Sequence, residues 1–220
     1  FSGTIVDIAH NFGAWITPLI PFDLVAEDAM TLFVALLLVA VACILMGAGI
    51  PTTPTYIILA SIVAPALDEF GIALLASHFF IFYYGVLADV TPPVALAAYA
   101  GAGIGGSDPM KTGVTAFRLS MGKALVPFMI IYAPSLLFLD FNAVEFTIAL
   151  VSGLFCIMAL SVAYIGYFFE EVGKAEKLIL TIAGLVMVGN NPIVVTVAGI
   201  VILGILIRNY RSAGPRLETA

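Results

Sequence analysis

The sequence contains few charged residues and very few basic ones. Charged residues make up 10% of its 220 residues, and eight Lys and Arg stand against fourteen Asp and Glu, a net charge of −6. A soluble domain carries about 25% charged residues, and a nucleic-acid-binding surface needs clustered Lys and Arg. The composition therefore excludes an ordinary soluble domain and predicts no nucleic-acid partner.

Cysteine and the common catalytic motifs are also scarce. The two cysteines, Cys43 and Cys156, each lie inside an apolar run, so neither a disulfide framework nor a zinc site is predicted. There is no P-loop, no His-Glu-x-x-His and no Gly-x-Ser-x-Gly. The glycines of 101–106 match a dinucleotide-binding pattern, but no strand precedes them, and we interpret them as a helix-packing contact. We expect neither an enzyme nor an organic cofactor.

Most residues of the sequence are apolar. They make up 62% of the chain, and the mean hydropathy is +1.17, which predicts an all-α polytopic membrane protein. The chain starts at Phe1 with membrane-like residues and no signal peptide, so we expect it to be a piece of a larger permease. Apolar runs cover 29–46, 56–67, 72–88, 94–104, 124–139, 144–169, 178–188 and 193–207.

Two of these runs are followed by a Gly, Pro and Thr-rich break and then by a half-length run. The breaks are Gly47–Thr55 and Asp89–Pro93. Irregular backbone at membrane depth must be buried in protein or line a cavity, and paired interrupted segments mark transporter binding sites. The alternative is a pair of proline-kinked helices, which a single proline at each break would favour.

Each break places a threonine beside a proline where the next half-helix begins. Thr53 is predicted to cap one half-helix with Pro54 at its first position, and Thr91 with Pro92 to do the same at the other. The free N–H groups of such helix starts suit a carboxylate. The carbonyls that end the preceding half-helices suit sodium.

Several residues near the breaks are candidate ligands. Gly47 and Gly49 allow the backbone to approach an ion closely. Asp89 is an intramembrane carboxylate, so it is a candidate sodium ligand or proton carrier; alternatively it lies near an interface or only caps the next helix. Tyr56 is a candidate substrate contact, whereas His10 and His78 are interpreted as packing residues.

These residues resemble the large membrane subunit of tripartite ATP-independent periplasmic (TRAP) transporters, in particular the fused permeases served by TAXI-type binding proteins. Met46–Tyr56 is similar to that family's Gly-x-Gly-x-Pro-Thr-Thr element, and Ala88–Tyr99 to its Thr-Pro-Pro element. Asp108–Gly113 with Ala116–Arg118 resembles the polar helix that follows. The resemblance covers about residues 40–140, and 145–220 fit only as extra C-terminal helices.

The resemblance implies a sodium-coupled secondary transporter with an elevator motion, importing small organic anions across the bacterial inner membrane. It implies an elevator-type repeat with a re-entrant hairpin and a broken helix. The implied divisions are the end of a preceding membrane helix with an outer loop (1–28), the re-entrant hairpin (29–67), the broken helix (72–104), a cytoplasmic amphipathic connector (105–123), a membrane helix (124–139) and C-terminal membrane helices with a tail (144–220).

The expected site combines both breaks. Substrate is expected to contact Thr52, Thr53, Tyr56 and Thr91, and sodium to bind around Gly47, Gly49, Asp89 and Thr91. The first inverted repeat of the family has no counterpart here. The expected partners are therefore the remainder of the permease, including small-subunit helices, a TAXI-type extracytoplasmic binding protein and the bilayer.

The distribution of charge fits this topology. A hairpin at 29–67 and a broken helix at 72–104 place every basic residue on one side of the membrane, which the positive-inside rule makes cytoplasmic. The basic residues are Lys111, Arg118, Lys123, Lys174, Lys177, Arg208, Arg211 and Arg216; the acidic residues opposite are Asp23, Glu27, Asp28, Asp68, Glu69, Asp140 and Glu145.

Two other functions remain open on sequence alone. Asp89 as a proton carrier would make uptake proton-coupled, and a membrane scaffold would not transport at all. The capping threonines of the breaks argue against a scaffold, which has no use for them. The identity of the substrate, the oligomeric state and the topology of 178–207 are left undetermined.

Overall fold

The computed structural model describes residues 2–16, 27–189 and 191–217, and its named elements in these ranges are all helices. They are α1 (Ser2–Ile16), α2 (Glu27–Gly47), α3 (Thr52–Asp68), α4 (Leu74–Leu87), η2 (Ala88–Val90), α5 (Leu96–Gly105), α6 (Pro109–Met121), α7 (Val126–Tyr132), η3 (Pro134–Leu137), α8 (Ala143–Ile165), α9 (Lys174–Val186), η4 (Met187–Gly189) and α10 (Pro192–Leu217). The chain divides into two compact units, 1–114 and 115–220. The expected all-α fold is confirmed.

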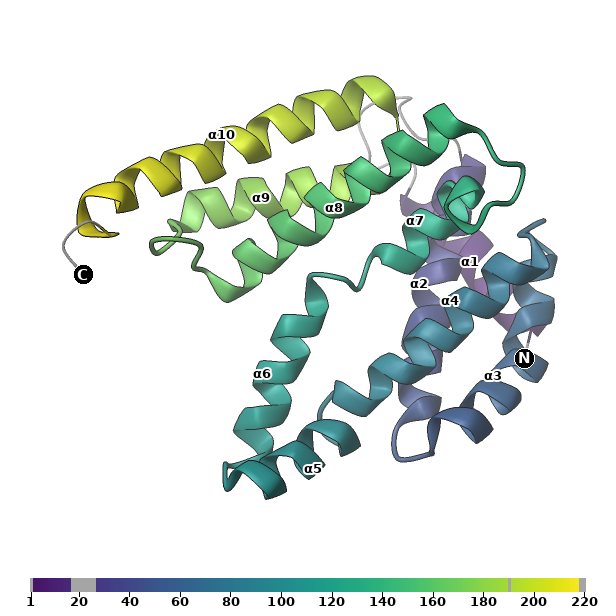
Figure 1. Cartoon of the computed structure of the whole chain (residues 1–220). Coiled ribbons are helices and arrows are strands. Elements are labelled where there is room, and N and C mark those ends of the chain that lie inside the picture. The colour runs from purple at the N-terminus through teal and green to yellow at the C-terminus, as the bar shows by residue number, and fades with distance from the viewer. Residues whose placement is uncertain (1, 17–26, 190, 218–220) are drawn as a thin grey trace. The chain divides into compact units, whose positions relative to one another are not determined.

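The first unit is built on α2, α3 and α4, which pack against one another (Figure 1). Their shared core contains Leu36, Leu59 and Phe80, none of which exposes more than 1% of its surface. The α1 helix packs on α2, where Ala9, Val34 and Ala35 are buried together. Burial of this kind stabilises helix pairs in a membrane through close packing, because lipid offers little hydrophobic driving force between helices.

Three stretches of the described residues are long and apolar enough to cross a membrane: 109–132, 143–165 and 192–212. A spanning helix needs about 20 apolar residues, and α4 and α5 have only 14 and 10. Neither is therefore long enough to cross the hydrocarbon core alone.

The segment 124–139, predicted as one membrane helix, is divided in the structure. The α7 helix ends at Tyr132, and η3 begins at Pro134 after Ala133 leaves the helical conformation (φ −136°, ψ 76°). A proline disfavours the α conformation in the residue before it, which accounts for the division. The apolar run at 109–132 likewise comprises two helices, α6 and α7, with a turn between them.

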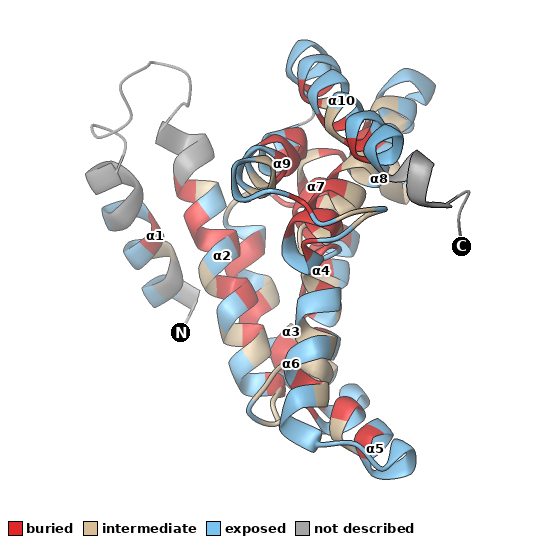
Figure 2. Ribbon diagram, turned by 90° about the vertical axis from the view of Figure 1, so that its left-hand side faces the viewer, coloured by how far each residue is buried: buried red, intermediate tan, exposed pale blue. Residues whose placement is uncertain are grey.

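The second unit is built on α8, α9 and α10, with α7, η3 and η4 packed on them. The α8 and α9 helices approach closely at Gly184 of α9, where an added Cβ would lie 3.1 Å from Leu160 Cγ of α8. A small residue at such a crossing brings two membrane helices close together. Exposed residues extend along much of α10 (Figure 2).

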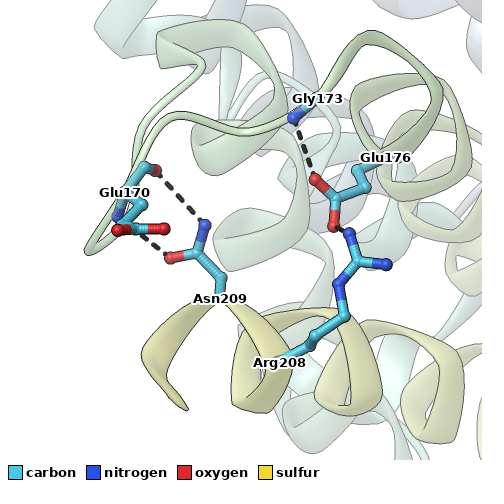
Figure 3. Close-up of polar contacts among 5 residues, drawn as sticks. All are labelled: Glu170, Gly173, Glu176, Arg208 and Asn209. Carbon is cyan, nitrogen blue, oxygen red and sulfur yellow. Dashed lines mark hydrogen bonds and ion pairs between the residues drawn. The ribbon is translucent and has the colours of Figure 1, made fainter. Parts of the chain in front are cut away.

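A polar cluster joins the end of α10 to the α8–α9 connection (Figure 3). The buried Asn209 side chain accepts a hydrogen bond from the Glu170 amide at 3.1 Å and donates one to the Glu170 carbonyl at 3.3 Å. It also accepts one from the Phe169 amide at 3.0 Å. Glu176 accepts a bond from the Gly173 amide at 2.8 Å and pairs with Arg208. The consecutive residues Arg208 and Asn209 thus fix α10 to the start of α9 and to the α8–α9 connection.

Candidate functional site

The first break is a short tip between α2 and α3. The α2 helix ends at Gly47 and α3 begins at Thr52, with Gly49 in the left-handed region at φ +83°. That conformation favours glycine, so Gly49 permits the reversal. The buried Thr55 closes the tip, since its hydroxyl donates to the Ile50 carbonyl at 3.1 Å.

The predicted cap of α3 is wrong. Pro51 is the N-cap residue and makes no side-chain cap bond, so Thr53 lies inside the helix and Pro54 occupies its third position rather than its first. The shift is tolerated because the first N–H groups of a helix have no intrahelical acceptor, and a proline there loses no hydrogen bond.

The second break lies between α4 and α5. After Leu87 the chain forms η2 and then an irregular stretch, and α5 begins only at Leu96. The predicted capping role of Thr91 is also wrong, since its hydroxyl donates backward to the Leu87 carbonyl at 2.7 Å and its amide to Ala88 at 3.1 Å. Thr91 therefore closes the end of the first half-helix. Ala95, in the left-handed region at φ 34°, precedes α5.

Tyr99 supports this second break from α5. Its hydroxyl donates to the Pro93 carbonyl at 2.7 Å. Gly113 of α6 approaches the same ring so closely that an added Cβ would lie 2.8 Å from Tyr99 Cε1. The two prolines at 92–93 have no N–H to offer, so the break depends on Thr91 and Tyr99 for its side-chain hydrogen bonds.

The structure brings the two breaks together. A Cβ added at Gly47 would lie 2.9 Å from the Gly85 carbonyl oxygen and 3.0 Å from Ala88 Cβ. A Cβ at Gly49 would lie 3.5 Å from Val94. The tip of the α2–α3 pair therefore contacts both the end of α4 and the irregular stretch that follows it.

Several polar groups at this junction are left without protein partners. In the described part of the chain, the exposed hydroxyls of Thr52 and Thr53 have no hydrogen-bond partner, and neither does the half-buried Asp89 carboxylate. No cluster of three or more His, Cys, Asp or Glu side chains occurs among the described residues. A cation here would rely on carbonyl and hydroxyl oxygens around one carboxylate, a donor set that suits sodium better than a transition metal.

Tyr56 lies one turn beyond the tip, at the α3–α4 contact. Its hydroxyl and His78 Nδ1 are 2.8 Å apart, and its ring meets Phe82 edge-on at 5.7 Å. His78 therefore packs as predicted and also forms a polar contact between the two helices.

Three residues of the site were not predicted from the sequence: Thr55, Gly85 and Tyr99. Gly85 is a single small residue inside an apolar run, and that is the signal that could have indicated a close helix approach. Nothing in the sequence distinguishes Thr55 from Thr52 and Thr53, or Tyr99 from an ordinary packing tyrosine.

Comparison with known proteins gives one match. The model of the family described as "Tripartite ATP-independent periplasmic transporter, DctM component" matches residues 1–144. No curated protein and no solved structure shows a significant match. The matched range includes both breaks and ends where α8 begins.

Proposed function

Because the chain belongs to the DctM family of TRAP transporter membrane components, we propose that it forms part of a sodium-coupled permease that imports small organic anions by an elevator motion. Membership makes it a multi-pass membrane protein and a transporter component, not an enzyme. In this proposal the chain acts in the cytoplasmic membrane. Its partners are a TAXI-type extracytoplasmic binding protein, the first inverted repeat and the small-subunit helices. Residues 145–220 are the extra helices of a fused permease.

The observation that carries the proposal is the meeting of the two breaks. The α2–α3 tip contacts the α4–α5 break through Gly47 and Gly49, and the end of α2 meets Ala88, the residue before Asp89. Carbonyls at helix C-termini and unwound segments bind sodium in such transporters. Sodium is assigned to Gly47, Gly49, Asp89 and Thr91.

The substrate carboxylate is assigned to the start of α3. Its two leading amides and the partnerless hydroxyls of Thr52 and Thr53 all supply donors at the positive end of the helix dipole. Tyr56 and Thr91 flank this position in the proposal. Because the Thr91 hydroxyl hydrogen is already donated to Leu87, Thr91 has only oxygen lone pairs to offer, which suits sodium better than a carboxylate.

The test is uptake by the whole permease reconstituted in vesicles with its binding protein. An imposed sodium gradient should drive anion uptake, and Asp89→Asn should abolish or uncouple it. Thr52→Val with Thr53→Val should raise KM about tenfold, as expected for the loss of hydrogen bonds to a charged group. Asp108→Asn, at the start of α6, is the matched carboxylate control.

Proton coupling is the second candidate, and the observation in its favour is that the Asp89 carboxylate has no partner among the described residues. Uptake driven by a pH gradient alone, without sodium, would support it and reject sodium coupling. Absence of any ion-driven uptake by the assembled complex would instead support a scaffold role.

A further inference from the structure

We propose that the cavity between α3 and α4 beside Tyr56 is a substrate subsite, in which His78 binds a second oxygen-bearing group of the transported anion. The cavity is lined by Tyr56, Leu75, His78, Phe79 and Phe82. The inference rests on the proposed transport function and narrows its substrate class to small organic anions with two polar ends joined by an apolar link.

The Tyr56–His78 contact prepares the imidazole for a ligand. The phenol hydroxyl meets Nδ1 at 2.8 Å, and the hydrogen bond at one ring nitrogen sets the role and direction of the other. Within the described residues Nε2 has no hydrogen-bond partner. The ring is thus held by Tyr56 with one nitrogen still available.

The imidazole of His78 lies in a part of the sequence that contains no Lys or Arg. The first Lys or Arg in the sequence is Lys111, so His78 is the single side chain between residues 29 and 104 able to carry a positive charge. An ionisable group in a membrane segment is costly and is functional by default. For an anion bound between the hairpin and the broken helix, residues 29–104 therefore offer no other basic side chain.

The position of the cavity fits one end of a ligand whose carboxylate binds at the start of α3. Thr52 and Tyr56 are four residues apart and share a face of α3, a rise of about 6 Å. The cavity volume is about 210 Å³, below the roughly 300 Å³ of a complete ligand site. It therefore suits part of a small molecule, with Leu75, Phe79 and Phe82 around its apolar link.

The test measures binding of three four-carbon probes to the purified whole permease in sodium: butyrate, 4-hydroxybutyrate and succinate. Succinate and 4-hydroxybutyrate carry a second oxygen group that butyrate lacks. We expect His78→Phe to weaken binding of these two about tenfold or more and to leave butyrate nearly unchanged. His78→Gln, which keeps a hydrogen-bonding side chain, should recover part of the loss.

Tyr56→Phe tests how the ring is positioned. It should weaken the binding of the same two probes. Adding it to His78→Phe should cause little further loss of binding, because both variants disrupt the same Tyr56–His78 pair. Leu74→Ala, at a 69% exposed side chain of α4 that does not line the cavity, is the control and should bind all probes as the wild type does.

Chemical labelling of the wild type tests the subsite even where the variants fail to fold. Diethyl pyrocarbonate should carbethoxylate His78 in the wild type, and succinate should protect it while His10 stays reactive, as read by peptide mass spectrometry. Equal labelling of His78 with and without succinate overturns the subsite.

Other outcomes separate this inference from the proposed function. Sodium-driven uptake by the wild type with unchanged probe binding in His78→Phe rejects the subsite alone. Failure of the wild type to bind succinate or 4-hydroxybutyrate also rejects it. If instead the variants lose thermal stability in proportion to their lost binding, the cavity is a packing contact with lipid or another helix, and the subsite is rejected.

Discussion

Gly47 is buried at the point where three helices meet, and its lack of a side chain sets their distance. The nearest atoms to an added Cβ belong to the Gly85 carbonyl, Ala88 and Thr55. Two of these are backbone or Cβ atoms, which cannot swing aside as the end of a long side chain can. The contact between the two breaks therefore depends on glycine at 47.

Gly47→Ala should separate the tip from the end of α4. A Cβ 2.9 Å from a carbonyl oxygen must displace one helix, and overpacking of this kind costs about 1–3 kcal/mol. We expect a lower melting temperature of the purified permease and a larger loss of uptake than of folded protein. An added Cβ at Gly103 meets nothing within 4 Å, and the same holds at Gly101, Gly105 and Gly106, so the helix-packing contact predicted for 101–106 is wrong for the described residues. Gly103→Ala, inside α5, should therefore lower neither measurement.

Asn209 is the residue on which the polar cluster of the second unit depends. Asn209→Ala would remove the acceptor of the Phe169 and Glu170 amides, which costs about 0.5–1.5 kcal/mol for each lost hydrogen bond. Thermal unfolding should show this loss. Asn209→Asp keeps the acceptor for both amides and should lose less, and equal losses in the two variants would contradict the hydrogen-bond explanation.

At the scale of the elements, the α4–α5 interruption is a defined structure rather than a proline kink. Thr91 closes the end of α4, Ala95 turns the chain, and Tyr99 bonds the Pro93 carbonyl. A proline-kinked helix would stay helical on both sides of the proline, whereas here five residues separate the end of η2 from the start of α5. Where irregular backbone of this kind lies at membrane depth, it is characteristic of binding sites.

Tyr99→Phe tests whether this defined shape serves transport. The variant keeps the ring against Gly113 but leaves the Pro93 carbonyl without its 2.7 Å donor. We expect normal membrane insertion and near-normal melting, with the uptake rate reduced about tenfold because the break can then vary in conformation. An uptake rate equal to that of the wild type would show that the Tyr99 bond serves packing only.

The sequence located both breaks but not the hydrogen bonds within them. Glycine and proline at 47–54 and 89–93 interrupt apolar runs so heavily that helix ends there follow from local chemistry. The roles of Thr53 and Thr91 were mispredicted for different reasons. The α3 helix begins before Thr53, and a sequence does not fix a helix boundary to the residue. The Thr91 hydroxyl bonds backward to the Leu87 carbonyl rather than forward to the next helix. Close contacts such as that between Gly47 and Gly85 join distant segments, which periodicity cannot reveal.

At the scale of the whole molecule, charge separates along the chain. The first 110 residues contain no Lys or Arg. Acidic Asp68 ends α3 and Glu69 follows it, whereas basic Lys111 lies in α6. Between them lie only α4, η2 and α5, which together form one interrupted crossing in the proposed topology. The positive-inside rule then places Lys111 in the cytoplasm and Glu69 outside.

Cysteine labelling of the intact permease tests this orientation. The two native cysteines, Cys43 and Cys156, are buried and would first be replaced by alanine. A single cysteine would then be introduced at an exposed position, as Glu69→Cys in one variant and Lys111→Cys in another. A membrane-impermeant maleimide added to intact cells should label the variant at 69 and leave that at 111 unlabelled until the membrane is permeabilised. Labelling of both from one side would mean that α4, η2 and α5 do not cross, so that 72–104 would be the re-entrant hairpin instead. The assignment of the α2–α3 tip to the hairpin would then be lost, and with it the assignment of sodium to the meeting of the two breaks.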